Sequence, residues 1–184
     1  MSVYQIRRAL APDLKVHAIS KCLKGVVHGN TSWTLQYAMA AGLERVLLKP
    51  GEDSLERRLL VFLEGGGAIV YVKDGGEVIG AATVGRCSGL WSESFLVEDL
   101  RVAKRITVMS DRVYEALLDG ILDVARITSE EVKKGPVLIH VGAATSERRL
   151  LRRTFKQYGF HQETAAQPDM WTAKVGGQEQ LAVA

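Results

Sequence analysis

The last third of the chain carries the pattern that most restricts its fold. Val137–Val141 is a short apolar run typical of a buried strand, and its one polar residue, His140, is predicted to be structural. Ser146–Tyr158 follows with apolar residues at helical spacing among many basic ones, and Gly159-Phe160 ends this helix. A buried strand that leads directly into an amphipathic helix predicts a sheet with helices packed against it.

The other segments predict a mixed α/β fold in one domain, residues 1–175, followed by a C-terminal tail, residues 176–184. The expected strands are Val3–Leu10, Ala68–Lys73, Glu77–Val84, Ser94–Val102, Phe160–Thr164 and Met170–Val175. The expected helices are a short one between Asp13 and Lys21, Trp33–Leu48, Leu55–Leu63 with Arg57 and Arg58 outward, and a long one starting near Ser110 or Asp111. Asp74-Gly75-Gly76 is expected to be a hairpin turn and Gly85–Ser92 a loop.

Composition indicates the cellular setting and excludes two kinds of site. The chain has 184 residues and a formal net charge of +3. Cys22 and Cys87 have no short-range pairing pattern, which favours reduced thiols and a cytoplasmic location. The four histidines lack the spacing of zinc ligands, so no metal site is expected. The N-terminus lacks a signal-peptide pattern and no run approaches about 18 uninterrupted apolar residues, so we expect no contact with a membrane.

The basic residues of the last predicted helix form one candidate binding surface. These residues are Arg148, Arg149, Arg152, Arg153 and Lys156. Spacings of three and four positions place them along a common side of the helix. Such a side binds a phosphate group, a nucleic acid backbone or an acidic partner, or it is a solvated face without a partner. The sequence leaves these alternatives open.

Taken in order, the predicted segments resemble the GCN5-related N-acetyltransferase (GNAT) superfamily from about Val3 to Val175. The run VIGAATV within Glu77–Val84 resembles the third strand of that family, and Ser94–Val102 resembles the fourth. The run FKQYGF, Phe155–Phe160, resembles the family's C-terminal motif. The resemblance implies a GNAT-like acyl-CoA N-acyltransferase fold, in which helices flank a central, mixed and twisted sheet.

Val137–Val141 resembles the fifth strand of the family, and the resemblance also implies a site where the fourth and fifth strands diverge. The pantetheine of acetyl-CoA would lie in the gap against the backbone of Leu100 and Val102, with Arg112 and Arg148 near its phosphates. An amine substrate would attack the thioester directly, with Glu98 or Asp99 as the general base. The alternative for these two carboxylates is a solvated pair without a catalytic role.

Two departures from the family pattern favour a different hypothesis. The positions of the pyrophosphate loop fall on Met109–Tyr114, where neither expected glycine is present and Arg112 and Tyr114 stand instead. Phe155 takes the place of a tyrosine that often protonates the leaving thiolate, and Tyr158 points about 60° away on an ideal helix. The alternative is therefore a non-catalytic GNAT-like protein that binds a macromolecular assembly partner. In layout the chain is also similar to GNAT-like structural proteins of short-tailed phages, which implies a virion location. The acceptor and the oligomeric state are left open.

Overall fold

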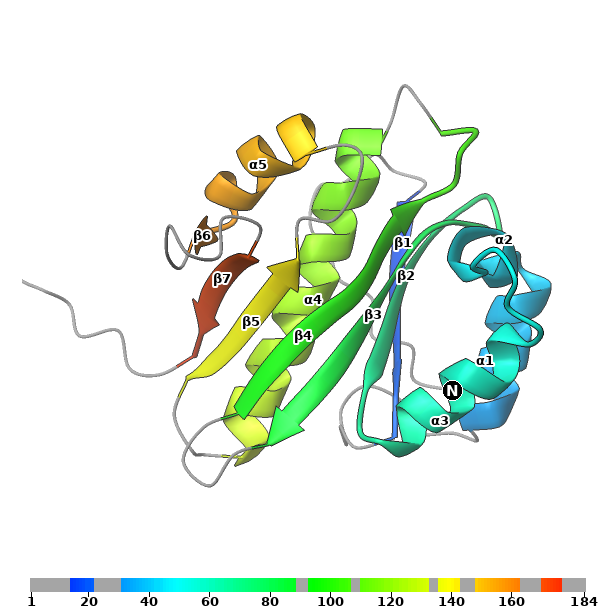
Figure 1. Cartoon of the computed structure of the whole chain (residues 1–184), viewed down its shortest axis with the longest axis horizontal. Helices are drawn as coiled ribbons and strands as arrows, with labels where there is room; N and C mark the ends of the chain where they lie inside the picture. Colours follow the sequence, from blue (N-terminus) through cyan, green and yellow to red (C-terminus); the bar gives the residue numbers. More distant parts are fainter. Residues whose placement is uncertain are drawn as a thin grey trace, which may run out of the picture.

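The computed structural model describes residues 14–21, 31–88, 93–106, 110–132, 136–142, 148–162 and 170–176. Its strands are β1 Leu14–Ser20, β2 Ala68–Asp74, β3 Glu77–Ser88, β4 Glu93–Val102, β5 Val137–Gly142, β6 His161–Gln162 and β7 Met170–Val175. Its helices are α1 Thr31–Ala40, α2 Leu43–Leu47, α3 Leu55–Glu64, α4 Ser110–Val132 and α5 Arg148–Gln157. Figure 1 shows that the strands form one twisted sheet and that the helices lie against it.

The strands form one mixed sheet in the order β1-β2-β3-β4-β5-β7-β6. β4 and β5 run parallel, and the other described neighbours run antiparallel. A parallel pair needs a long crossover connection, which α4 supplies between β4 and β5. The predicted mixed sheet flanked by helices is confirmed.

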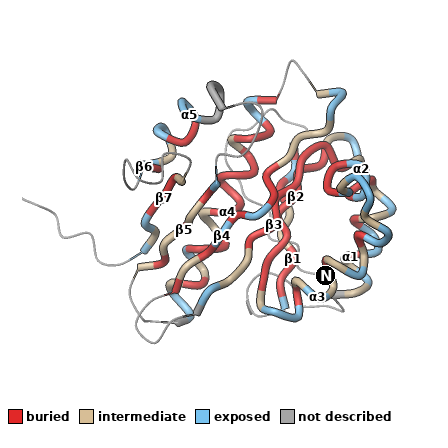
Figure 2. Tube along the Cα trace, viewed as in Figure 1, coloured by how far each residue is buried: buried red, intermediate tan, exposed pale blue. Residues whose placement is uncertain are grey.

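Helices cover both faces of the sheet and divide the core into two parts. Ile69 and Tyr71 of β2 pack with the buried residues of α1, α2 and α3, whereas Val70 and Val72 pack with those of α4. Because successive side chains of a strand point to opposite faces, β2 contributes to both parts and is almost entirely buried. Figure 2 shows the buried residues concentrated in the central strands and along α4.

The helix predicted between Asp13 and Lys21 is wrong, because residues 14–20 form strand β1. This strand pairs antiparallel with β2 from Leu14↔Asp74 to Ser20↔Ala68. Its burial alternates in part, with Leu14 and Val16 buried and Lys15 between them exposed, which is the strand period of two. Pairing with the free edge of β2 therefore decides the local structure. The predicted strand Val3–Leu10 lies outside the described residues.

Three other predicted boundaries also change. The single helix predicted for Trp33–Leu48 is interrupted at Gly42, whose φ of 103° is compatible with glycine but not with a continuous helix. Gly85–Ser88, predicted as loop, continues strand β3, because these residues pair with residues 93–96 of β4. The predicted strand Phe160–Thr164 is a two-residue strand, His161–Gln162, within the described part of the chain.

His17 of β1 makes the stability of the fold sensitive to pH. Its ring stacks on Tyr71 with centroids 5.1 Å apart, and burial, followed by the charges of Lys73 and Lys15, lowers its pKa from 6.5 to about 4. As the pH falls, His17 therefore takes up a proton near pH 6.5 in the unfolded chain but only near pH 4 in the folded chain. The contribution of neutral His17 to the free energy of unfolding is thus complete above pH 6.5 and is lost as the pH falls toward 4.

We expect His17→Phe, which keeps a ring on Tyr71 but cannot titrate, to remove part of the acid sensitivity. Between pH 7 and pH 5 the wild-type free energy of unfolding should fall by about 1 kcal/mol more than that of the variant, a value reduced for the partial exposure of the ring. Urea titrations at the two pH values measure this difference. Identical pH dependence in both proteins would show that His17 contributes nothing.

Candidate active site

β4 and β5 pair only along the first half of β4. Their register runs from Glu93↔Val137 to Val97↔Val141. Gly142, the last residue of β5, still pairs with Met170 of β7 but no longer with β4, whereas β4 continues beside β3 as far as Gly80↔Val102. In Figure 1 the ribbons of β4 and β5 separate toward their carboxyl ends. The predicted divergence of these two strands is therefore present.

The divergence leaves backbone groups of β4 without a strand partner. The N–H groups of Asp99 and Ala103 point toward β3, where they donate to Thr83 Oγ1 at 3.1 Å and to the Ile79 carbonyl at 2.8 Å. Successive N–H groups of an extended strand alternate between its two edges, so those of Leu100 and Val102 point toward the β5 side. The described part of β5 offers them no pairing, and polar backbone groups within a sheet need partners.

Two helices begin at the edge where the strands diverge. α4 follows β4 and begins at Ser110, and α5 follows β5 and begins at Arg148. Figure 1 places the first turns of both helices at the end of the sheet toward which β4 and β5 run. Unpaired N–H groups and the helix dipole make such ends favourable for anions.

The first turns of α4 carry both exposed and buried side chains. Arg112 is exposed, whereas Tyr114 is buried in the core. Although Tyr114 stands at a position where the family has a glycine, its side chain therefore does not obstruct the start of the helix. Val113 is also buried, and its Cγ1 leaves no room for a Cβ at Gly80, so α4 packs directly on β3. Met109 and the side chain of Arg148 lie outside the described parts of the chain.

A β-bulge in β4 brings two carboxylates to one face of the sheet. Val97 pairs with Val84 and Asp99 with Thr83, which leaves Glu98 as the extra residue. Asp99 therefore lies beside Thr83, on the face covered by α1–α3. Glu98 lies on the same face, because its Oε1 is 3.0 Å from the place of a Cβ at Gly85, two residues along β3 from Thr83.

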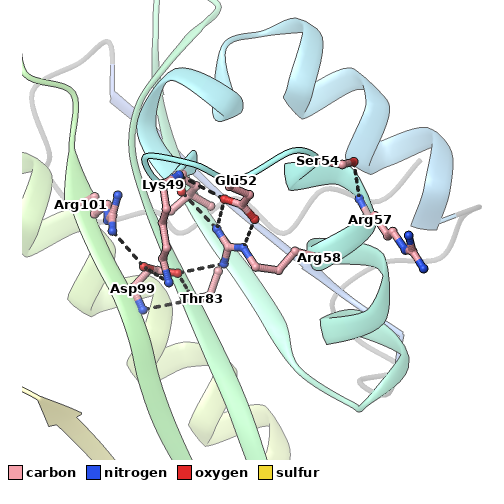
Figure 3. A network of polar contacts seen from close by, with 9 residues as sticks. Lys49, Glu52, Ser54, Arg57, Arg58, Thr83, Asp99 and Arg101 are labelled. Carbon is pink, nitrogen blue, oxygen red and sulfur yellow. Dashed lines mark hydrogen bonds and ion pairs between the residues drawn. The ribbon is translucent and has the colours of Figure 1, made fainter.

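Asp99 is a buried carboxylate whose two oxygens are both fully engaged (Figure 3). Its Oδ2 accepts hydrogen bonds from Arg58 Nη1 and Thr83 Oγ1, both at 3.1 Å. Its Oδ1 forms ion pairs with Lys49 Nζ at 3.3 Å and Arg101 Nη2 at 3.5 Å. A carboxylate offers about four lone-pair positions. Asp99 is thus poorly placed to accept a proton from a substrate.

Arg58 connects Asp99 to the chain between α2 and α3. Its Nε donates to Glu52 Oε1 at 2.6 Å, and its Nη2 donates to the Leu47 carbonyl at 3.1 Å. The hydrogen bond from Arg58, followed by one from the Lys49 backbone N–H, lowers the pKa of Glu52 below its usual value. This network therefore fixes the segment after α2 and helix α3 onto β3 and β4.

Glu98 differs from Asp99 in both exposure and contacts. It is exposed, and no described side chain forms a hydrogen bond or ion pair with it. Phe62 of α3 lies close to it, 3.6 Å from the same Cβ position at Gly85. Of the two predicted base candidates, Glu98 is the one whose oxygens are available to a substrate.

The structure also places the other residues selected from the sequence. Phe155 is buried against Phe160 and Trp171, so it is a core residue. Tyr158 donates its hydroxyl to Asp119 Oδ2 of α4 at 3.3 Å, as expected for a side chain directed elsewhere. His140 Nδ1 lies 3.0 Å from Thr172 Oγ1, which confirms its structural hydrogen bond.

The basic helix is exposed where its side chains are described. Arg152, Arg153 and Lys156 are exposed, and none of the three forms an ion pair within the described part of the chain. Arg148 and Arg149 begin α5, but their side chains lie outside that description. Binding of an acidic or phosphate-bearing partner by this helix stays a prediction.

Sequence patterns did not reveal the residues that surround Asp99. Arg57 is exposed as predicted, but Arg58 is turned inward and reaches a carboxylate 41 positions away. Lys49, Glu52 and Thr83 belong to three other segments, and no spacing rule connects them. No local signal distinguished Arg58 from Arg57, because consecutive helix residues are about 100° apart and both can be exposed, as Arg152 and Arg153 of α5 are.

Neither a metal-ion site nor a membrane-spanning helix is present among the described residues. These residues contain no group of three or more His, Cys, Asp or Glu side chains arranged to hold a metal ion. None of the described helices combines the length and apolar character that a membrane crossing requires.

Known structures give the fold a name. No family model matches the chain, and no curated protein matches its sequence. An aminoglycoside 6′-acetyltransferase of type Ii is 15% identical with a TM-score of 0.53, over 77% of this chain and 90% of the other. An aminoglycoside acetyltransferase from an uncultured soil metagenomic sample is 16% identical with a TM-score of 0.55, over 82% and 93%. The chain has the GNAT acetyltransferase fold.

A third solved structure with the GNAT fold supports the extent of this likeness. The ribosomal-protein-S18-alanine N-acetyltransferase from Escherichia coli is 11% identical with a TM-score of 0.53, over 91% of this chain and 97% of the other. The similarity therefore includes nearly the whole of that protein, although so low an identity shows only the fold. A shared fold does not by itself determine the function.

Proposed function

We propose that the protein is an acyl-CoA-dependent N-acyltransferase that transfers an acetyl group to an amine. The observation that carries this proposal is the unpaired edge of β4 beside β5, next to the first turns of α4 and α5. An extended ligand with amide groups satisfies such an edge as a further strand would. The GNAT fold supports the same conclusion.

The residues at the divergence fit acetyl-CoA in three respects. The N–H groups of Leu100 and Val102 would hold the amides of pantetheine, because they have no described strand partner. The N-terminus of α4 and the exposed Arg112 would hold the pyrophosphate, with the guanidinium replacing part of a glycine-rich loop. Arg148 begins α5 at the same edge and is the remaining candidate for a phosphate contact.

Glu98 is the proposed general base. An ammonium acceptor loses one proton to the Glu98 carboxylate, and the free amine is then a nucleophile. Bound acetyl-CoA supplies a thioester, whose carbonyl carbon gains the bond to nitrogen as its bond to sulfur breaks, and the second proton from nitrogen ends on the sulfur. One of the two N–H groups, that of Leu100 or Val102, would stabilise negative charge on the carbonyl oxygen instead of holding a pantetheine amide.

The remaining groups support this chemistry without taking part in it. Asp99 is assigned a positioning role, since its oxygens are engaged by four donors. Phe155 is buried and has no proton to donate, and the Tyr158 hydroxyl is hydrogen-bonded to Asp119. We therefore propose that the proton reaches the leaving sulfur through water.

Arg112→Glu should weaken the binding of acetyl-CoA. We expect the wild-type protein to bind with micromolar affinity in isothermal calorimetry and the variant to bind at least about tenfold more weakly, because a carboxylate would replace a phosphate-binding cation. Arg57→Glu is the matched control, since Arg57 is exposed on α3, away from the divergence. This variant should bind acetyl-CoA with the affinity of the wild type.

The same titration decides between the two hypotheses from the sequence. The alternative, a non-catalytic structural or binding protein, requires no coenzyme. Absence of binding to the wild-type protein at millimolar acetyl-CoA would remove the enzymatic proposal and favour that alternative.

A further inference from the structure

The charges around Asp99 are unbalanced on the side that faces solvent. Lys49, Arg58 and Arg101 surround two carboxylates, those of Glu52 and Asp99. Arg58 uses its donors on Glu52, Leu47 and Asp99. The group therefore has one positive charge more than its carboxylates balance.

The excess charge lies on Lys49 and Arg101. Each makes one described ionic contact, with Asp99 Oδ1, and their side chains are 43% and 38% exposed. An ammonium has three donors and a guanidinium five, so both retain donors that face solvent. Figure 3 shows the two cations on neighbouring sides of the Asp99 carboxylate.

Glu98 lies close to these cations on the same face. Glu98 and Asp99 are adjacent in β4 and Arg101 is two residues beyond Asp99, and the bulge brings both carboxylates to the α1–α3 side. Gly85, beneath Glu98, and Thr83, beside Asp99, are two residues apart on β3, which corresponds to about 7 Å. The free carboxylate of Glu98 and the two cations held by Asp99 are thus placed over neighbouring positions of β3 on one face of the sheet.

This arrangement is unfavourable for an acceptor with several positive charges. A polycationic amine needs several free carboxylates, but Asp99 and Glu52 are paired within the network and Glu77 is paired with Arg45 and Arg105. On the α1–α3 face of β4, Glu98 is the carboxylate without a described partner, whereas Asp111 lies in the first turn of α4, which covers the other face. Lys49 and Arg101, on the same face as Glu98, repel a second ammonium.

We infer that the acceptor is a primary amine that also carries a carboxylate. Its nitrogen lies toward Glu98, and its carboxylate accepts hydrogen bonds from Lys49 and Arg101. The inference rests on the proposed acetyl transfer, in which the nitrogen gains the acetyl group and the carboxylate is unchanged. On this inference, amines with several positive charges are poor acceptors for this protein.

Three amines of matched length test the inference with acetyl-CoA as donor: 5-aminopentanoate, 5-aminopentanamide and 1,5-diaminopentane. We expect kcat/KM, measured by release of the coenzyme thiol, to be at least about tenfold higher for the aminocarboxylate than for the amide, and lowest for the diamine. The preference should appear mainly in KM, because the carboxylate contacts are the same before and during the reaction.

Substitutions assign the preference to the two cations. Arg101→Gln should lower the preference for the aminocarboxylate over the amide to within about threefold, and Lys49→Gln should do the same if Arg101→Gln does not fold. Arg57→Gln, the same change at an exposed arginine of α3, should leave the preference as in the wild type.

Each contrary result has its own meaning. Turnover of the diamine or the amide at least equal to that of the aminocarboxylate overturns the inference and leaves acetyl transfer intact. A preference that survives in both Arg101→Gln and Lys49→Gln overturns it as well, as does binding of acetyl-CoA without turnover of 5-aminopentanoate. Absence of acetyl-CoA binding overturns the proposed function together with this inference.

Discussion

Glu98→Gln should lower kcat/KM for acetyl transfer by about 100-fold. Glutamine keeps the size of the side chain but cannot accept the proton that an ammonium acceptor must lose, and a positioned general base commonly contributes this much. Because Glu98 is exposed and forms no described hydrogen bond, neither the fold nor the backbone edge at Leu100 and Val102 should change. Initial rates of thiol release measure the loss.

Two controls separate loss of a base from general damage. Thermal unfolding and the acetyl-CoA dissociation constant of Glu98→Gln should equal those of the wild type. Glu131→Gln, at an exposed glutamate near the other end of α4, should retain full activity. Activity of Glu98→Gln within threefold of the wild type would rule out Glu98 as the base.

Asp99→Ala should reduce the free energy of unfolding by about 3 kcal/mol. The side chain of Asp99 is 3% exposed and holds Arg58, Lys49 and Arg101, so its removal leaves partly buried positive charge without compensation. The value is at the lower end of the usual range because Arg58 keeps Glu52. Denaturation by urea, with the slope compared between proteins, measures the change.

Glu77→Ala is the matched control for this effect. Glu77 also holds two arginines, Arg45 and Arg105, but its side chain is 37% exposed, so water replaces the lost partner. We expect a much smaller change than for Asp99→Ala. Equal changes in the two variants would contradict the view that burial makes Asp99 important.

Local patterns predicted the part of the sheet that carries the candidate site. β2, β3 and β4 were recognisable because each has the composition of a strand and the first two are joined by Asp74-Gly75-Gly76, in which both glycines have positive φ. The start of α4 at Ser110 agrees with the long helix predicted to begin near Ser110 or Asp111. These signals are contained in short stretches, so no tertiary information was needed.

The features that were missed depend on distant parts of the chain. The sequence of β1 predicted a helix, and its strand conformation depends on pairing with β2. The extension of β3 beyond Val84 likewise depends on pairing with residues 93–96 of β4. The bulge at Glu98 is a property of the pairing between two strands and has no sequence signature. The contacts of Asp99 with Lys49 and Arg58 likewise exist only after α2 and α3 pack on the sheet.

The short ladder between β4 and β5 has a mechanical consequence. Five residue pairs join these strands, whereas nine join β3 to β4, so the sheet consists of a four-stranded block and a three-stranded block with a weak seam between them. α4 packs against strands of both blocks and acts as the clamp across the seam. Loosening of that helix would let the two blocks swing apart while the hydrogen bonds inside each block stayed intact.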